Sequence, residues 1–173
     1  MVQFMRVEKI SRVLGLCLLG MCLQSGGSVW AAEDALRSVP KVTLRAADKT
    51  FSIADLKGRV VIVDFWASWC GPCRQSFPWM NAMQQKYQDQ GLEIVAVNLD
   101  QKPEEAELFL KEIPAQFTVA FDAAGVSPEA FGVMGMPSSY LIDRQGNIRS
   151  EHIGFHPDEA EAYESEIAEL LKH

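Results

Sequence analysis

The sequence predicts an α/β protein in which a mixed sheet lies between two layers of helices. Two apolar runs, typical of strands buried on both faces, carry this prediction: Val60–Asp64, extended by Phe65 and Trp66, and Leu92–Leu99. The helical pattern between them implies a right-handed parallel crossover. With a later hairpin and a final amphipathic helix, the elements form a three-layer α/β/α sandwich.

Residues 1–31 have the composition of a signal peptide. Basic residues precede the apolar run Val13–Leu23, which is shorter than the roughly 20 residues of a membrane-spanning helix. Val29–Ala31 then forms a small-residue cleavage site. We expect cleavage after about Ala31 and a periplasmic protein. An uncleaved inner-membrane anchor is the alternative.

The remaining chain is predicted to be one domain, residues 41–173, after a loose lead-in over residues 32–40. The formal net charge of the whole chain is −7, and residues 32–173 hold 13 Lys and Arg against 22 Asp and Glu. This acidic balance argues against a nucleic-acid partner. We expect a monomer without a bound cofactor or metal.

The domain is predicted to open with an N-terminal β-hairpin. Lys41–Leu44 and Thr50–Ile53 are short strand-like segments around a turn at Ala46–Lys49. Asp55–Gly58 forms a second turn, which leads into the central strand.

A long helix is predicted after Cys73, because apolar side chains recur at helical spacing. Pro78 should kink this helix, and Gly91 should end it. The residues that define its buried face are Phe77, Met80, Met83, Gln84 and Tyr87.

An inserted helix–strand segment follows the second buried strand. Pro103–Glu112 is a predicted helix, and Phe117–Phe121 a short strand. Ser127 is expected to cap a short helix that runs through Phe131.

The chain ends in a predicted hairpin and helix. Ser139–Ile142 and Ile148–Ile153 pair across the turn Asp143–Gly146. The last helix begins at Pro157, and it is expected to bury Tyr163, Ile167, Leu170 and Leu171.

Cys70 and Cys73 are placed where the first buried strand ends and the long helix begins. Free backbone N–H groups and the helix dipole stabilise an anion there, and the thiolate is the form of cysteine that attacks a disulfide. We expect Cys70 to be the exposed attacking sulfur and Cys73 to resolve the mixed disulfide. Pro72 is tolerated because the first helical turn has no partner for its missing N–H.

Two other roles for these cysteines are weaker. A structural bridge across two residues constrains the unfolded chain very little, and Cys17 and Cys22 lie in the segment expected to be removed. A zinc site would need His152 and His156 beside the two sulfurs. We expect instead that His152 is an exposed strand residue and that His156 caps the last helix.

Asp64 is the one acid inside the first apolar run. Loss of solvation should raise its pKa, so that it can exchange protons at working pH. We therefore expect Asp64 to be the proton acceptor for the cysteine pair.

These motifs resemble the thioredoxin family. Trp69–Cys73 matches the thioredoxin active site letter for letter, and Asp64 and Pro78 fall where thioredoxins have a buried acid and a helix-kinking proline. Gly135–Asp143 is similar to the segment with the cis-proline. With the inserted segment, Lys41–Lys172 resembles the membrane-facing, thioredoxin-like TlpA/ResA group.

The resemblance implies a substrate groove beside Cys70. Its expected members are Trp69 at the rim, the Gly71–Pro72 dipeptide, the Met136 backbone before a cis Pro137, and Gly154. Trp69 could instead be a core aromatic residue. A cis bond would leave the Met136 backbone free to pair with an extended substrate.

Two positions depart from the family pattern. Ser76 stands where the TlpA/ResA group often has a glutamate, and Ala96 stands where thioredoxins have a lysine near the buried acid. The proton-handling site is therefore expected to have the acid without its usual helpers.

We predict an exported thiol-disulfide oxidoreductase that reduces protein disulfides through a redox-active Cys70–Cys73 pair. The resemblance suggests a membrane thiol donor of the CcdA/DsbD type, and apocytochrome c as a substrate. One alternative is a disulfide oxidase or isomerase. Another is a non-catalytic carrier that uses the thiols to hold a metal or an apoprotein.

Overall fold

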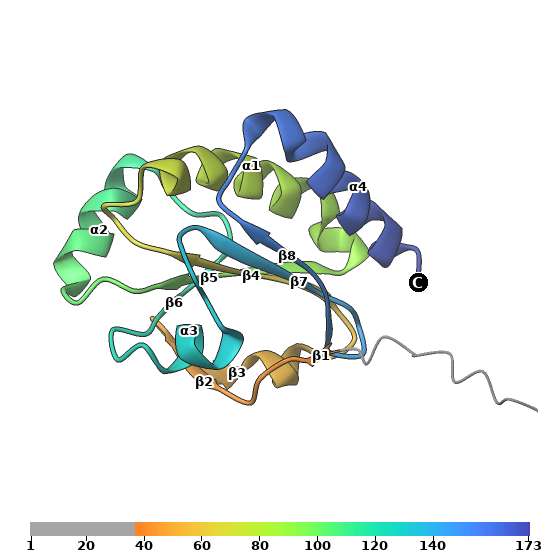
Figure 1. Cartoon of the computed structure of the whole chain (residues 1–173), viewed down its shortest axis with the longest axis horizontal. Helices are drawn as coiled ribbons and strands as arrows, with labels where there is room; N and C mark the ends of the chain where they lie inside the picture. Colours follow the sequence, from red (N-terminus) through yellow and green to blue (C-terminus); the bar gives the residue numbers. More distant parts are fainter. Residues whose placement is uncertain (1–36) are drawn as a thin grey trace, which may run out of the picture. The chain divides into compact units, whose positions relative to one another are not determined.

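The computed structural model describes residues 37–173 (Figure 1). The expected signal peptide with its cleavage site near Ala31, and with it Cys17 and Cys22, lies outside these residues. Within the described part, no helix is long and apolar enough to cross a membrane.

The described residues form a mixed sheet in the spatial order β1-β8-β7-β4-β5-β6-β2-β3. Neighbours β4, β5 and β6 run parallel, and the remaining pairs are antiparallel. The strands are β1 (Arg37–Ser38), β2 (Thr43–Ala46), β3 (Thr50–Ser52), β4 (Val60–Trp66), β5 (Leu92–Asn98), β6 (Thr118–Phe121), β7 (Ser138–Ile142) and β8 (Asn147–Ile153).

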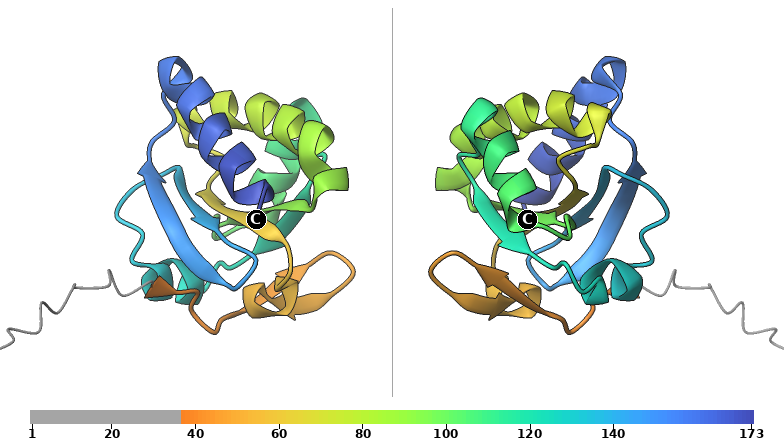
Figure 2. Two further views of the ribbon diagram at one scale, coloured as in Figure 1. Left: turned by 90° about the vertical axis from the view of Figure 1, so that its right-hand side faces the viewer. Right: turned by 90° about the vertical axis from the view of Figure 1, so that its left-hand side faces the viewer.

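Helices cover both faces of this sheet (Figures 1 and 2). Helices α1, α2 and α4 lie on one face, and α3 lies on the other, where it shares an apolar cluster with residues of the β2–β3 hairpin. The expected three-layer sandwich, its N-terminal hairpin and its inserted α2–β6 segment are thereby confirmed. The helices are α1 (Gly71–Tyr87), α2 (Pro103–Glu112), α3 (Val126–Phe131) and α4 (Ala160–Leu171).

Strand β4 is buried along its whole length because both of its faces are covered. Side chains alternate between the faces of a strand. Val60, Ile62 and Trp66 pack under α1, whereas Val61, Val63 and Phe65 pack on the α3 side. By the same alternation Asp64 belongs to the α1 face.

Residues 37–40 differ from the expectation of a loose lead-in over residues 32–40, of which residues 32–36 lie outside the described part. Arg37 and Ser38 form β1, which pairs with the start of β8, and Val39 is buried. A two-residue strand has no periodicity of its own, so the sequence pattern does not reveal it. Strand β2 begins and ends two residues later than expected. Strand β3 ends one residue earlier, because Ile53 begins a 3₁₀ turn, Ile53–Leu56, capped by Ser52.

The helix ends bring two further corrections. The cap of α3 is Gly125, and Ser127 lies inside the helix, where its backbone N–H and its hydroxyl both donate to Asp122. Helix α4 is preceded by the 3₁₀ turn Pro157–Glu159. Of the four residues expected to be buried on α4, Ile167 is fully buried and the others are half-buried. Helix α1 ends as expected, through the turn Gln88–Gln90 and a left-handed Gly91.

Arg144, in the β7–β8 turn, joins three segments at one end of the sheet. Its guanidinium donates to the carbonyl of Gly58 before β4, of Gln90 after α1, and of Leu171 at the end of α4. The last carbonyls of a helix have no partner within the helix, and a cation is favourable there.

Phe77 is the centre of the aromatic cluster under α1, where its ring contacts those of Trp66, Phe109 and Phe117. We expect Phe77→Ala to lower the free energy of unfolding by about 3–5 kcal/mol, because it removes a fully buried ring and leaves a cavity. Leu108→Ala, at a position 62% exposed on α2, is the control and should change stability by less than about 0.5 kcal/mol. Equal costs in urea unfolding would contradict this account of the core.

Candidate active site

Cys70 and Cys73 form a disulfide at the start of α1, with their Cα atoms 5.3 Å apart. Cys70 is the N-cap residue, and the backbone N–H of Cys73 donates to its Sγ over 3.2 Å. Pro72 lies in the first helical turn. In the reduced protein the same N–H and the helix dipole are placed to stabilise a Cys70 thiolate.

The two sulfurs differ in access. Cys73 is completely buried, whereas Cys70 is 4% exposed and has the exposed residues Gly71 and Pro72 after it. Cys70 is therefore the more accessible sulfur, although less exposed than we expected. Trp69 is 71% exposed, so it stands at the surface beside Cys70 and is not a core residue.

The loop before Cys70 is fastened to the end of β5. The buried carboxylate of Asp100 accepts from the backbone N–H of Ser68 over 2.9 Å and from its hydroxyl over 3.0 Å. Asn98 donates to the same carboxylate, over 2.8 Å. This arrangement fixes the turn from which the cysteines project.

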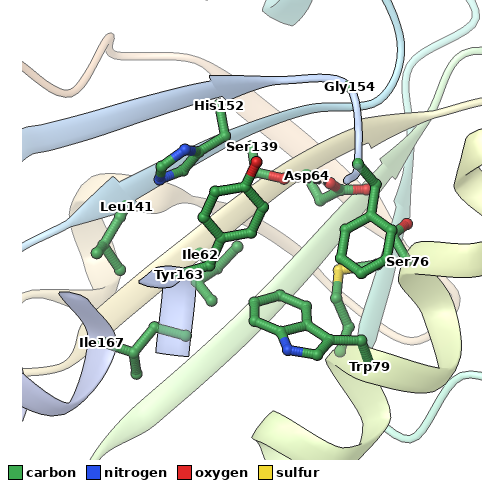
Figure 3. Close-up of a pocket in the computed structure, with 12 residues that line it drawn as sticks. Ile62, Asp64, Ser76, Trp79, Ser139, Leu141, His152, Gly154, Tyr163 and Ile167 are labelled. Carbon is green, nitrogen blue, oxygen red and sulfur yellow. Dashed lines mark hydrogen bonds between the residues drawn. The ribbon is translucent and has the colours of Figure 1, made fainter. Parts of the chain in front are cut away.

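Asp64 is completely buried on the α1 face of β4, beneath the helix that carries Cys73. In the sheet it is paired with Ala96 on β5 and with Ser139 on β7. The Ser139 hydroxyl donates to Asp64 Oδ1 over 2.5 Å (Figure 3). Among the described residues Oδ2 has no hydrogen-bond partner.

This environment raises the pKa of Asp64 from 3.8 to about 7. The main cause is loss of solvation on burial, which the hydrogen bond from Ser139 partly offsets. A carboxyl group with such a pKa exchanges protons near neutral pH, which is what a general acid or base requires.

The two departures from the family pattern both lie beside this acid. Ala96 offers no charge across the strand pair, as expected from its side chain. Ser76 is buried one turn after Cys73, and its hydroxyl donates to the Cys73 carbonyl over 3.1 Å. Neither residue supplies a charge, so burial controls the ionisation of Asp64.

Three of the expected groove residues, Met136, Pro137 and Gly154, lie before β7 and after β8. The Met136–Pro137 bond is cis, as the resemblance implied. Gly154 has φ +85°, and its N–H donates to the Pro137 carbonyl over 2.8 Å. The left-handed conformation favours glycine at this position. The hydrogen bond joins the end of β8 to the segment that contains Pro137.

The structure corrects the roles that we expected for the two histidines. His152 is half-buried, its ring lies 4.2 Å from that of Tyr163, and its Nε2 is 3.0 Å from Glu166 Oε2. His156 is the N-cap residue of the 3₁₀ turn Pro157–Glu159, not of α4, and it makes no capping bond through its side chain. Within residues 37–173, no group of three or more His, Cys, Asp or Glu is arranged to hold a metal ion, so the hypothetical zinc ligands are not assembled.

A small pocket connects Asp64 with His152 (Figure 3). Its volume of about 20 Å³ is enough for one water molecule. Strands β4, β7 and β8 form its floor, and side chains of α1 and α4 form its walls. Most of the lining is apolar, and its polar side chains are those of Asp64, Ser76, Ser139, His152 and Tyr163.

A family model described as Redoxin matches residues 33–171. The chain belongs to the Redoxin family. The thiol-disulfide oxidoreductase ResA of Bacillus thuringiensis subsp. konkukian is 34% identical to it over 124 residues, which are 72% of this chain and 68% of that protein. These matches confirm the predicted likeness to ResA.

Two solved structures extend this picture of the Redoxin family. A protein described as the thiol:disulfide interchange protein DsbE of Chlorobium tepidum is 51% identical, with a TM-score of 0.77, over 79% of this chain and 96% of the other. A protein described as a protein disulfide isomerase of Bacteroides thetaiotaomicron is 26% identical, with a TM-score of 0.72, over 79% and 89%. With its Cys70–Cys73 disulfide, this Redoxin family member is a thiol-disulfide oxidoreductase that acts on proteins.

Asp100, Ser139 and Glu166 were not among the predicted site residues. Asp100 follows the end of a buried parallel strand, which is a recognisable position for a polar residue near a site. Ser139 meets Asp64 through the register of β7 with β4, and Glu166 meets His152 through the packing of α4 on β8. The sequence pattern does not indicate either contact.

The raised pKa of Asp64 predicts a pH-dependent stability. Because folding raises this pKa, the protonated Asp64 makes its full contribution to the free energy of unfolding below about pH 4. This contribution is lost as the pH rises through about 7. At 1.36 kcal/mol per pKa unit, the loss reaches about 4 kcal/mol. We expect Asp64→Asn to stabilise the oxidised protein by as much as that amount more at pH 8 than at pH 4, as measured by urea unfolding.

Asp48→Asn, in the exposed turn between β2 and β3, is the matched control. It should shift stability equally at both pH values. If the stabilities of the two variants depended on pH in the same way, the raised pKa of Asp64 in the folded protein would be contradicted.

Proposed function

We propose that this protein is an exported reductant of protein disulfides, with Cys70 as the attacking sulfur. The observation that carries this proposal is the position of Cys70 at the N-cap of α1, where the Cys73 N–H reaches its Sγ. The Cys70 thiolate attacks a substrate disulfide, the substrate S–S bond breaks, and one substrate sulfur leaves and takes a proton from solvent.

Cys73 completes the reaction. Its thiol gives its proton to Asp64, and its sulfur attacks Cys70 Sγ in the mixed disulfide. The second substrate sulfur then leaves, so that two electrons have passed to the substrate and the Cys70–Cys73 disulfide remains. A donor dithiol reverses these steps, and the Cys73 sulfur then takes a proton back from Asp64. The burial of both groups on the same face of β4 supports this assignment.

Substrates are proposed to bind in extended form along the Met136–Pro137 segment. The Met136 backbone would pair with the substrate chain, Gly154 would line the groove, and Trp69 would cover its rim beside Gly71 and Pro72. The exposure of Trp69 and the hydrogen bond from Gly154 to Pro137 support this arrangement. Backbone pairing gives affinity with little side-chain selectivity.

The proposed setting is the periplasm, reached through the signal peptide over residues 1–31. Because that compartment is oxidising, a reductant there needs electrons from a membrane thiol donor, and we propose one of the CcdA/DsbD type. The resemblance to the TlpA/ResA group suggests apocytochrome c cysteines as a substrate. The protein is proposed to act as a monomer.

Disulfide isomerisation is the second candidate, favoured by the structural likeness to the protein described as a disulfide isomerase. The Gly71–Pro72 dipeptide between the cysteines favours the reductant, since reducing thioredoxins share it. A carrier that holds a metal through its thiols is weakened by the scattered positions of the candidate ligands in residues 37–173.

Cys73→Ser should trap the substrate. The variant can still attack through Cys70 but cannot resolve the mixed disulfide, so we expect covalent complexes with cellular proteins and at least a hundredfold loss of insulin reduction. Cys70→Ser should lose the activity without forming complexes. Full activity of Cys73→Ser, with no trapped protein, would remove the resolving role.

The direction of electron flow can be measured independently. We expect the Cys70–Cys73 couple, titrated against glutathione buffers, to be more reducing than glutathione. A potential at or above that of glutathione would favour the oxidase or isomerase. The same titration of the Pro72→His variant tests whether the Gly71–Pro72 dipeptide sets the reduction potential. We expect this variant to be more oxidising than the wild-type protein.

A further inference from the structure

Asp64, Ser139 and His152 lie on one rung that crosses three strands. Asp64 on β4 is paired with Ser139 on β7, and Ser139 is paired with His152 on β8. Residues directly opposite one another in antiparallel strands point to the same face. At the usual strand spacing, the rung spans about 10 Å from the Asp64 Cα to the His152 Cα.

The inner end of this rung faces the pocket with an unused polar atom. Asp64 is completely buried, and among the described residues its Oδ2 lacks a partner, whereas Oδ1 accepts from Ser139. Asp64 and His152 both line the pocket, whose volume of about 20 Å³ admits one water molecule (Figure 3). A water needs two to four polar partners, and the polar side chains in the lining are those of Asp64, Ser76, Ser139, His152 and Tyr163.

The outer end of the rung reaches solvent. The His152 side chain is 21% exposed, and its Nε2 meets Glu166 on α4, whose side chain is 40% exposed. Ser150 also donates to Glu166, over 2.6 Å, and the Tyr163 ring lies against the imidazole. These contacts hold His152 in one orientation at the mouth of the pocket.

The other polar groups around the pocket are engaged elsewhere. Ser76 donates to the Cys73 carbonyl, and the hydroxyl of Tyr163 donates to Glu159. Helix α1 contributes only uncharged side chains to the described lining, Trp79 and Met80 beside Ser76. An imidazole can take up a proton on one nitrogen and release one from the other, and His152 reaches solvent, so it is the suitable group through which a proton can leave.

We propose that His152, oriented by Glu166, is the proton exit for Asp64. After Cys73 has given its proton to Asp64, the proton passes from Oδ2 through the pocket to the imidazole, which releases it to solvent beside Glu166. The imidazole regains its initial form, and no electrons move in this step. When the disulfide is reduced again, a proton returns by the same route. This inference rests on the proposed role of Asp64 as the acid–base group.

The test follows the protonation of Asp64 directly. In the oxidised full chain, the carbonyl stretch of the protonated Asp64 side chain, identified by its loss in Asp64→Asn, is recorded by time-resolved infrared spectroscopy after a pH jump. We expect His152→Ala to slow this signal on the order of tenfold, less than the loss of a direct general acid. Added imidazole should restore the rate, because it can replace the missing side chain.

His173→Ala is the matched control. It removes a histidine that pairs with Glu169 of α4, the helix that also carries Glu166, but that does not line the pocket. It should leave the rate unchanged. The glutamine of His152→Gln can keep a hydrogen bond to Glu166 but cannot take up and release a proton. Protonation of Asp64 should therefore be slow in this variant, which also serves if His152→Ala does not fold. A wild-type rate in His152→Gln, or a slow His152→Ala that imidazole does not restore, would overturn the proposal.

The two proposals fail in different ways. If Asp64→Asn reduced insulin at the wild-type rate, Asp64 would not be the acid–base group, whatever the infrared signal showed. If Asp64→Asn were slow in that assay while His152→Gln kept the wild-type protonation rate, the role of Asp64 would stand and the exit through His152 would be wrong.

Discussion

The register between β4, β7 and β8 is the constraint on which the chemistry of this protein depends. It places a carboxyl, a hydroxyl and an imidazole on one rung, under the helix that carries the cysteines. A shift by one residue would turn every side chain of the shifted strand to the opposite face. The apolar residues that alternate with Asp64 prevent this shift, because both faces of β4 are packed.

The core therefore supports a group that is costly to bury. An ionised carboxylate away from water is unfavourable, and Asp64 responds by remaining protonated up to about neutral pH. The aromatic cluster around Phe77 on one side and the packing of Phe65 on the other compensate for this cost. Stability and proton exchange are thus linked at a single residue.

Much of the fold could be predicted from the sequence, because long apolar runs and helical periodicity dominate β4, β5, α1 and α2. The site was predictable where neighbours in the chain define it, as for Cys70 and Cys73 at the start of a helix. Asp64 was recognisable because it interrupts an apolar run. The prediction failed for β1, which is too short to show a period, and for His152, whose burial depends on how α4 packs over β8.

A single residue, Arg144, joins three segments at one end of the domain. One guanidinium fastens the chain before β4, the chain after α1 and the last turn of α4 at the end of the sheet where β4 begins. The cysteines lie at the other end, where β4 finishes. Loss of the Arg144 side chain would therefore leave three backbone carbonyls without this donor at once, all at the end of the sheet opposite the sulfurs.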